Sequence, residues 1–146
     1  MLAALKAARE LAIHPTMPNG AVIISSKGKI IGRGAISSEY HQKNGCDRVK
    51  LGIPTGQSYE LCEGCHPKNH SEPKAIADAQ KKGFDPSDGA LYLWGHWWCC
   101  EPCWQAMVAA GIKRVFLLRD AQVLFNKLNP HNIVGRQFEY FSAQLK

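Results

Sequence analysis

Two short runs of residues constrain the fold of this chain most strongly: His-Ser-Glu from position 70 and Cys-Glu-Pro-Cys from position 100. Together they supply one imidazole, two thiols and a carboxylate. A catalytic zinc site typically has three protein ligands and leaves a fourth position for water. Zinc lowers the pKa of that water to about 7, and a nearby glutamate can move its protons. The two runs therefore predict a catalytic zinc held by His70, Cys100 and Cys103, with Glu72 as the catalytic carboxylate.

The spacing of these residues predicts a helix–strand–helix unit. Cys100 and Cys103 are three positions apart at a helix start, which places both sulfur atoms on one face. The positive end of the helix dipole favours the thiolate form, which is the form that binds metals. The 27 residues from 73 to 99 provide one helix and one strand. A strand between two helices brings the N-termini of both helices to the same edge of the sheet.

The rest of the chain predicts further helices and strands around this unit. Apolar residues at three-residue steps predict a first helix, which Pro15 and Pro18 end. Trp94 and Trp104 are expected in the core. The predicted elements are helix 2–13, strands 21–24 and 30–35, helix 72–82, strand 90–94, helix 100–110, strand 113–118 and a short C-terminal helix. This order predicts one α/β domain over residues 1–146, with helices against a mixed sheet.

The order His-x-Glu followed by Cys-x-x-Cys is the signature of zinc-dependent nucleobase deaminases. On these residues the chain resembles the cytidine deaminase superfamily, and its layout is most similar to that of deoxycytidylate deaminases. Two positions depart from the family pattern: Ser71 replaces a common Ala, and Cys99 stands where Pro is usual. The resemblance implies a three-layer α/β/α fold with a sheet of about five strands. It also implies an enzyme that converts a ring amino group to a carbonyl and releases ammonia.

The same resemblance implies a set of substrate contacts. The backbone N–H of Ser71 would hold the ring carbonyl, and the carbonyl of Cys99 would meet the leaving amine. Trp97 aligns with the Trp of a Ser-Trp-Ser-Pro-Cys run in polynucleotide-editing cytidine deaminases, so Trp97 is a candidate for the pocket wall. Trp98 lies in the same loop and is a second candidate.

A second group of cysteines lies in the stretch 37–69, which has no sustained periodicity. Loops of this length within a domain are uncommon and are usually functional or fixed by another interaction. Three cysteines and one histidine make a closed structural zinc set. The predicted ligands are Cys46, Cys62, Cys65 and His66. His41 is the alternative to His66, and reduced cysteines without a metal are the simpler interpretation.

A rival arrangement joins the two groups into one site. Cys62 and Cys65 with Cys100 and Cys103 would form a four-cysteine zinc site in a binding module without catalytic activity. This arrangement leaves the His-Ser-Glu run without a role. Metal stoichiometry separates the two interpretations.

The charge of the chain bears on its substrate. The net charge of +6 is compatible with an anionic substrate, although Lys and Arg are scattered rather than clustered. Because the insertion is similar to that of deoxycytidylate deaminases, the expected substrate is a cytosine nucleotide or nucleoside, with Arg48 near the phosphate. Ala35-Ile36-Ser37-Ser38 lacks the Asn that these enzymes commonly have there. Polynucleotide cytosine or adenine, or another amino-heterocycle, is therefore the alternative.

The cysteine spacing and the termini bear on the cellular setting. Six cysteines in C-x-x-C spacing beside histidines favour zinc in a reducing cytosol over disulfides. No apolar run approaches 20 residues, so no membrane span is expected. The N-terminus lacks the order of a signal peptide, and a cytoplasmic location is expected. A small-molecule nucleotide or nucleoside is the expected partner, and a homo-oligomer is compatible with the sequence.

Overall fold

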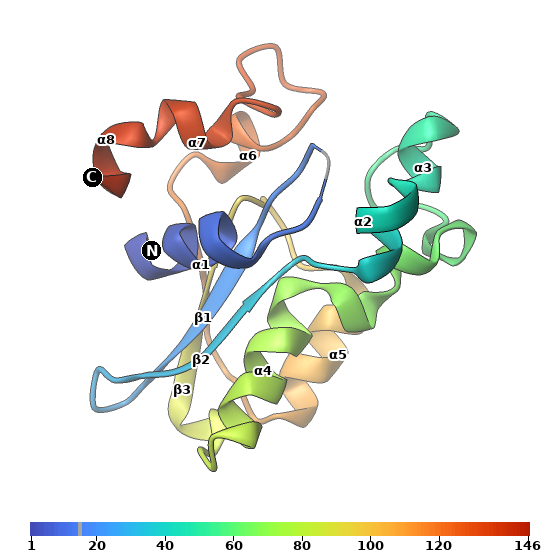
Figure 1. The fold of residues 1–146 in the computed structure, drawn as a ribbon. Helices are drawn as coiled ribbons and strands as arrows, with labels where there is room; N and C mark the ends of the chain where they lie inside the picture. Colours follow the sequence, from blue (N-terminus) through green and yellow to red (C-terminus); the bar gives the residue numbers. More distant parts are fainter. Residues whose placement is uncertain (15) are drawn as a thin grey trace.

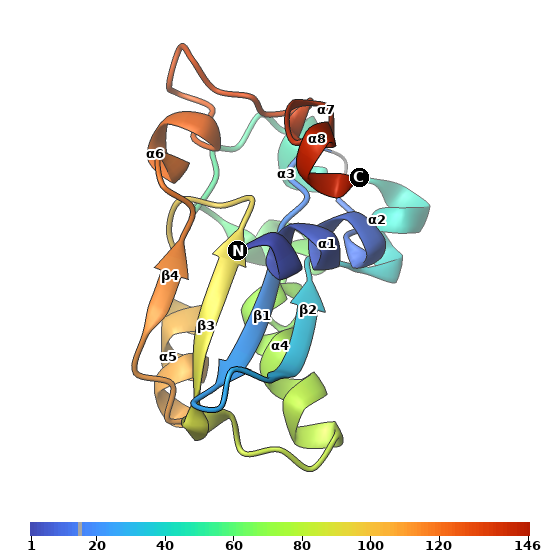
Figure 2. The same ribbon diagram turned by 90° about the vertical axis from the view of Figure 1, so that its left-hand side faces the viewer.

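A mixed sheet lies at the centre of the molecule. The computed structural model describes residues 1–14 and 16–146, so Pro15 and its predicted role lie outside the described residues. In these residues the sheet has four strands in the order β2-β1-β3-β4 (Figure 2). They are β1 (Gly20–Ser25), β2 (Ile30–Ala35), β3 (Gly89–Trp94) and β4 (Val115–Leu117). β1 pairs antiparallel with β2 and β3, whereas β4 is parallel to β3.

Helices cover both faces of this sheet. On one face lie α4 (Ser71–Lys81) and α5 (Glu101–Ala109), and on the other lies α1 (Leu2–Leu11) (Figure 1). Ala21, Val22 and Ile23 of β1 are fully buried, because a central strand with helices on both sides exposes neither face. The predicted three-layer α/β/α fold is confirmed, with four strands among the described residues instead of about five.

The C-terminal segment packs on the same face as α1. It contains α6 (Ala121–Leu124), α7 (Gln137–Tyr140) and α8 (Ser142–Leu145). Trp94, at the end of β3, is 1% exposed and stacks on Phe138 with ring centroids 5.6 Å apart. The core position predicted for Trp94 is confirmed. The one predicted for Trp104 is wrong, because this residue is 47% exposed.

The insertion at residues 37–69 is built from short helical pieces. These are α2 (Glu39–Asn44), α3 (Asp47–Lys50) and the 3-10 turns η1 (Tyr59–Leu61), η2 (Glu63–Cys65) and η3 (Pro67–Asn69). A fourth turn, η4 (Pro86–Asp88), precedes β3. The insertion lies beyond the N-terminal end of α4 (Figure 1). Among the helices described, none is long and apolar enough to cross a membrane.

Candidate metal centre and active site

The first candidate site lies where two helices begin. His70 is the N-cap residue of α4 and Cys100 is the N-cap residue of α5. β3 lies between these helices in the chain, so both helices start at the same edge of the sheet. His70 Nδ1 lies 3.4 Å from Cys100 Sγ and 3.3 Å from Cys103 Sγ, and the two sulfur atoms are 3.0 Å apart. One ion can contact three atoms this close at zinc distances of about 2.0 Å to nitrogen and 2.3 Å to sulfur.

Cys100 and Cys103 form a hydrogen-bonded pair in which one thiol is readily ionised, even without a bound cation. The hydrogen bond with Cys103 lowers the pKa of Cys100 to about 4, and the neighbouring His70 adds to this effect. The same hydrogen bond, together with burial, raises the pKa of Cys103. The pair therefore holds one thiolate, and a bound cation would deprotonate the second thiol. This donor set fits zinc.

The ring of His70 is fixed from its far side. Its Nε2 lies 3.1 Å from the backbone oxygen of Cys65. With Nδ1 facing the sulfur atoms and bound to an ion, Nε2 would carry the proton and donate a hydrogen bond to this carbonyl. The Tyr59 ring packs edge-on against the imidazole, with centroids 5.3 Å apart. Outer-shell contacts of this kind fix the tautomer and the orientation of a ligating histidine.

Glu72 is buried beside the three donors. It is 5% exposed, and burial raises the pKa of its carboxyl group. The Ser71 hydroxyl donates to Glu72 Oε2 at 3.0 Å, and burial together with the nearby Glu72 carboxylate raises the pKa of the Cys99 thiol. A carboxyl group with a raised pKa is suited to accept and return protons near neutral pH. The hydrogen bond from the Ser71 side chain was missed by sequence reasoning, which treated Ser71 only as a backbone contact.

A pocket opens above this site, and only some of the predicted substrate residues line it. Trp98 and Arg48 do so, together with Glu72 and two of the metal-site donors, His70 and Cys100. Ser71, Cys99 and Trp97 are outside the described lining.

Trp97 instead stacks on His96, with ring centroids 4.6 Å apart, and packs against the core on the α1 side of the sheet. The pocket wall is therefore formed by the neighbouring Trp98.

Further lining residues were missed from the sequence. Asn19, His14 and Lys127 face the pocket from segments outside the helix–strand–helix unit. Asn19 immediately precedes β1, whose first residue, Gly20, pairs with Trp94 at the end of β3. This pairing places Asn19 at the same edge of the sheet as the loop that enters α5. Asn19 could have been identified as a pocket residue only from the order of the strands, which was not predicted.

The second cysteine group also comes together, but with a different histidine. His41, Cys46, Cys62 and Cys65 are all buried, and their ligand atoms lie within 4.8 Å of one another. His66 is not part of this group: its side chain is exposed, and its Nδ1 accepts a hydrogen bond from the Lys68 N–H at the start of η3. His41, the alternative considered from the sequence, takes the fourth place.

The cysteines of the two groups are not combined as the rival arrangement requires. Cys62 and Cys65 belong to the group with His41, and Cys100 and Cys103 belong to the group with His70. The described residues therefore do not form the single four-cysteine site.

Arg48 is held by the insertion. It is 7% exposed, and its guanidinium donates to the carbonyl oxygens of Gln57 and Pro54, both at 2.8 Å. A third N–H donates to Cys65 Sγ at 3.3 Å, and the group lies over the Tyr59 ring. These contacts give Arg48 a role in ordering the insertion, whatever its contact with substrate.

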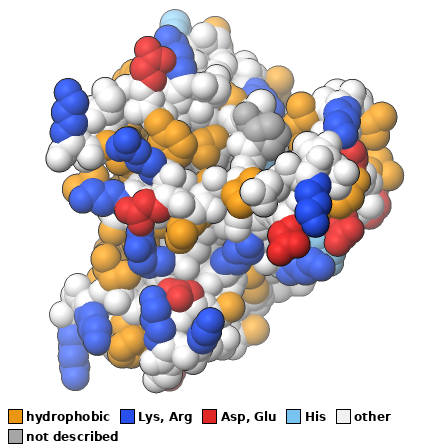
Figure 3. Space-filling view, viewed as in Figure 1, with side chains coloured by type: hydrophobic (Ala, Val, Ile, Leu, Met, Phe, Trp, Pro, Cys, Tyr) orange, Lys and Arg blue, Asp and Glu red, His pale blue; other side chains and the backbone are white. Residues whose placement is uncertain are grey.

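Lys and Arg side chains are scattered over one face of the molecule (Figure 3), as they are scattered along the sequence. On the face drawn in Figure 3, Lys and Arg side chains are spread over the whole view rather than gathered into one stripe. A protein that tracks a polynucleotide backbone typically has a basic patch or stripe.

The fold and the donor set define a class, the hydrolytic deaminases that use zinc to exchange a ring amino group for oxygen. The chain belongs to the cytidine and deoxycytidylate deaminase family, because residues 1–119 match the family model described as the cytidine and deoxycytidylate deaminase zinc-binding region. No curated protein matches the chain in a sequence search.

The solved structures that match the chain include a deaminase/reductase, a protein named RibD and a guanine deaminase. The diaminohydroxyphosphoribosylaminopyrimidine deaminase/5-amino-6-(5-phosphoribosylamino)uracil reductase of Thermotoga maritima is 23% identical with a TM-score of 0.48, covering 97% of this chain and 32% of that one. Acinetobacter baumannii RibD is 18% identical with a TM-score of 0.45, covering 97% and 31%. The guanine deaminase of Bacillus subtilis is 21% identical with a TM-score of 0.44, covering 86% and 78%. The chain thus spans about a third of the length of the Thermotoga maritima enzyme and of Acinetobacter baumannii RibD.

Proposed function

We propose that the chain deaminates the cytosine ring of a nucleotide, replacing the ring amino group by oxygen from water and releasing ammonia. The observation that carries the proposal is the shared pocket of Glu72, His70 and Cys100. His70, Cys100 and Cys103 would hold the zinc ion. When bound, zinc supplies Lewis-acid activation of the attacking water.

Glu72 transfers the protons in this proposal. Its carboxylate accepts a proton from the attacking water and passes it to the ring nitrogen. It then helps to protonate the departing amine, so that the substrate and one water become the carbonyl product and ammonia. The Ser71 hydroxyl holds the carboxylate in place through the hydrogen bond described above. The backbone N–H of Ser71 and the carbonyl of Cys99 remain the proposed contacts for the ring carbonyl and the amine.

The charge around the pocket supports a substrate with a phosphate. Among the described lining residues, Glu72 supplies the one carboxylate, whereas Arg48 and Lys127 supply cations. Three N–H groups of Arg48 are already bonded within the insertion. Lys127 is exposed and lines the pocket, so Lys127 is the better partner for a phosphate than Arg48, the residue expected from the sequence.

The substrate is tested by measuring ammonia release from cytosine, adenine and guanine, each as base, nucleoside, nucleotide and single-stranded oligonucleotide. The proposal expects the highest kcat/KM for a cytosine mononucleotide. Equal turnover of nucleoside and nucleotide would refute the phosphate contact. Activity confined to oligonucleotides, or to another ring, would establish the alternative substrate class instead.

The role of Glu72 is tested with Glu72→Ala. Loss of a general acid–base typically costs about 10²–10⁴ in rate, so kcat should fall by at least about 100-fold while zinc stays bound. Glu101→Ala is the matched control, because Glu101 follows the ligand Cys100 directly but is exposed and outside the described pocket lining. A Glu72→Ala variant that loses its zinc, or keeps its rate, would contradict the assignment.

A further inference from the structure

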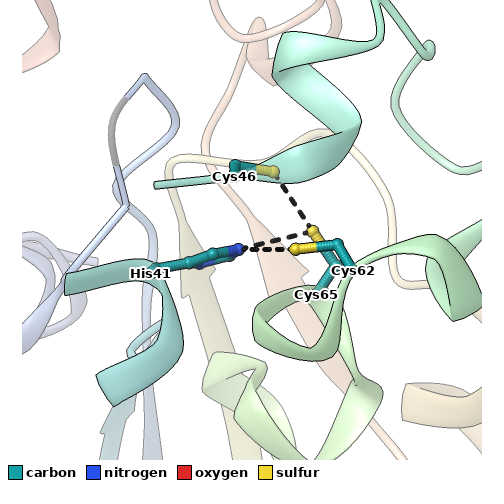
Figure 4. A group of neighbouring side chains, drawn as sticks. All are labelled: His41, Cys46, Cys62 and Cys65. Carbon is teal, nitrogen blue, oxygen red and sulfur yellow. Dashed lines mark hydrogen bonds between the residues drawn. The ribbon is translucent and has the colours of Figure 1, made fainter. Parts of the chain in front are cut away.

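We propose that His41, Cys46, Cys62 and Cys65 form a second zinc site, and that this site positions His70 of the catalytic centre through Cys65. The four side chains come from separate parts of the insertion: α2, the start of α3 and the turn η2. Figure 4 shows the imidazole of His41 pointing at the sulfur atoms of Cys62 and Cys65, with Cys46 above them and its sulfur atom joined to that of Cys65 by a dashed line. The positioning role rests on the proposed function, whereas the existence of the second site does not.

The distances fit a tetrahedral ion. His41 Nε2 lies 3.3 Å from Cys62 Sγ and 3.7 Å from Cys65 Sγ, and the sulfur atoms of Cys46 and Cys65 are 3.5 Å apart. Tetrahedral zinc with bonds of about 2.0 Å to nitrogen and 2.3 Å to sulfur separates its ligands by roughly 3.5–3.8 Å. A disulfide would bring two sulfur atoms to about 2.05 Å. The group therefore has the spacing of metal ligands and contains no disulfide.

Gly64 makes room for the histidine. A Cβ atom placed on Gly64 would lie 2.7 Å from His41 Cγ, and closer still to Cδ2 and Nε2 of the same ring. Real Cβ atoms do not approach other atoms this closely, so a side chain at this position would push the imidazole away. The chain thus has a residue without a side chain where His41 must enter the loop between Cys62 and Cys65.

The charge of Arg48 is a second, independent observation. A buried cation is costly unless an opposite charge lies nearby. Among residues 1–14 and 16–146 no carboxylate forms an ion pair with Arg48, yet its Nη1 lies 3.3 Å from Cys65 Sγ. Three thiolates, one neutral imidazole and a divalent cation carry a net charge of −1. The proposed site supplies the missing counter-charge for the buried guanidinium.

Cys65 links the two centres. Its sulfur atom belongs to the second group, and its backbone oxygen accepts the Nε2–H of His70 at 3.1 Å. A second link runs from Arg48 over the Tyr59 ring, at 4.6 Å, to the His70 ring, at 5.3 Å from Tyr59. An ion bound by Cys65 would fix η2, and with it the carbonyl that sets the tautomer and orientation of His70.

The metal count tests the site without using activity. Wild-type protein, dialysed against zinc-free buffer and measured by elemental analysis, should hold two zinc ions per chain. Cys100→Ser/Cys103→Ser should keep one, because the insertion is unchanged. His41→Ala and Cys62→Ser should each also keep one, whereas His66→Ala, the matched histidine control, should keep two. A single zinc in the wild type, or none in Cys100→Ser/Cys103→Ser, would overturn the second site.

The positioning role is tested by the rate at which the catalytic zinc passes to a chromogenic chelator. Loss of an outer-shell partner typically costs 10- to 100-fold in metal affinity, so release from His41→Ala should be about tenfold faster than release of the catalytic zinc from His66→Ala. The catalytic zinc of His66→Ala is identified as the release phase that is absent from Cys100→Ser/Cys103→Ser. Equal rates would overturn the coupling. If His41→Ala does not fold, the wild-type count and Cys100→Ser/Cys103→Ser still decide the site, and Cys62→Ser decides the coupling.

Failure of this inference can be told apart from failure of the proposed function. Two zinc ions in a protein that releases ammonia from none of the tested heterocycles would refute the function and leave the second site intact. An active enzyme that holds one zinc ion would refute the second site and leave the proposed function intact.

Discussion

Gly34→Ala should impair catalysis far more than it impairs stability. Gly34 lies on β2 against the first turn of α4, the turn that carries Glu72. A Cβ atom at this position would lie 2.9 Å from the backbone carbon of Lys74, and closer still to Ser71 O and Ala75 N. Ordinary contact begins at 3.4 Å, so relief of the Lys74 contact alone requires 3.4 − 2.9 = 0.5 Å. The two nearer atoms raise the required displacement of this turn to about 1 Å.

A displacement of this size has unequal effects on folding and on chemistry. Overpacking in a core typically costs about 1–3 kcal/mol, which lowers the melting temperature of a chain of this length by several degrees. A misplacement of about 1 Å at a reacting group can cost about 100-fold in rate. We therefore expect a folded variant with kcat reduced by about 100-fold.

Gly32→Ala is the matched control. Gly32 lies on the same strand and faces the same helix, but its added Cβ would meet Ala75 and Ala79, farther from the start of α4. Both variants should lose similar stability in thermal unfolding followed by circular dichroism. Only Gly34→Ala should lose most of its kcat. Equal losses of kcat in the two variants, with equal zinc content, would refute the reasoning.

Two further substitutions test the surroundings of the site. Lys127→Ala should raise KM for the nucleotide several-fold and leave the nucleoside unaffected, because a contact made equally in ground and transition states changes mainly KM; steady-state kinetics beside the exposed control Lys113→Ala checks this. Ser71→Ala removes a hydrogen bond that stabilises the ionised form of Glu72, so the pKa of Glu72 should rise. Because Glu72 must be ionised to accept the proton, the acid limb of the kcat/KM profile should move to higher pH, and an unmoved limb would contradict this.

The proximity of His70, Cys100 and Cys103 could be predicted because the geometry of this group is local. Cys100 and Cys103 are one turn apart at a helix start, and one helix and one strand connect them to His70. Helix periodicity and the short connections of a layered fold leave little freedom in how these segments meet. The fold class followed from the same unit.

The fourth member of the second group could not be settled from sequence because its position depends on long-range packing. His66 adjoins Cys65 and was the nearest candidate, but Pro67 starts η3 at once and the His66 ring turns outward to cap it. His41 lies 21 positions before Cys62 and reaches it through α2. Nothing in the local spacing distinguishes a ring that caps a turn from one that enters a cluster.

The insertion also forms part of the wall of the active-site pocket, which gives the second site a wider consequence. Arg48, Tyr59 and Cys65 face the pocket, and each belongs to the insertion or contacts its cysteine group. An insertion that lost its metal would loosen this wall together with the carbonyl that orients His70. Substrate affinity and retention of the catalytic zinc should then fall together, although none of the four ligands of the second site takes part in the chemistry. A surface loop that only decorates the fold would affect neither.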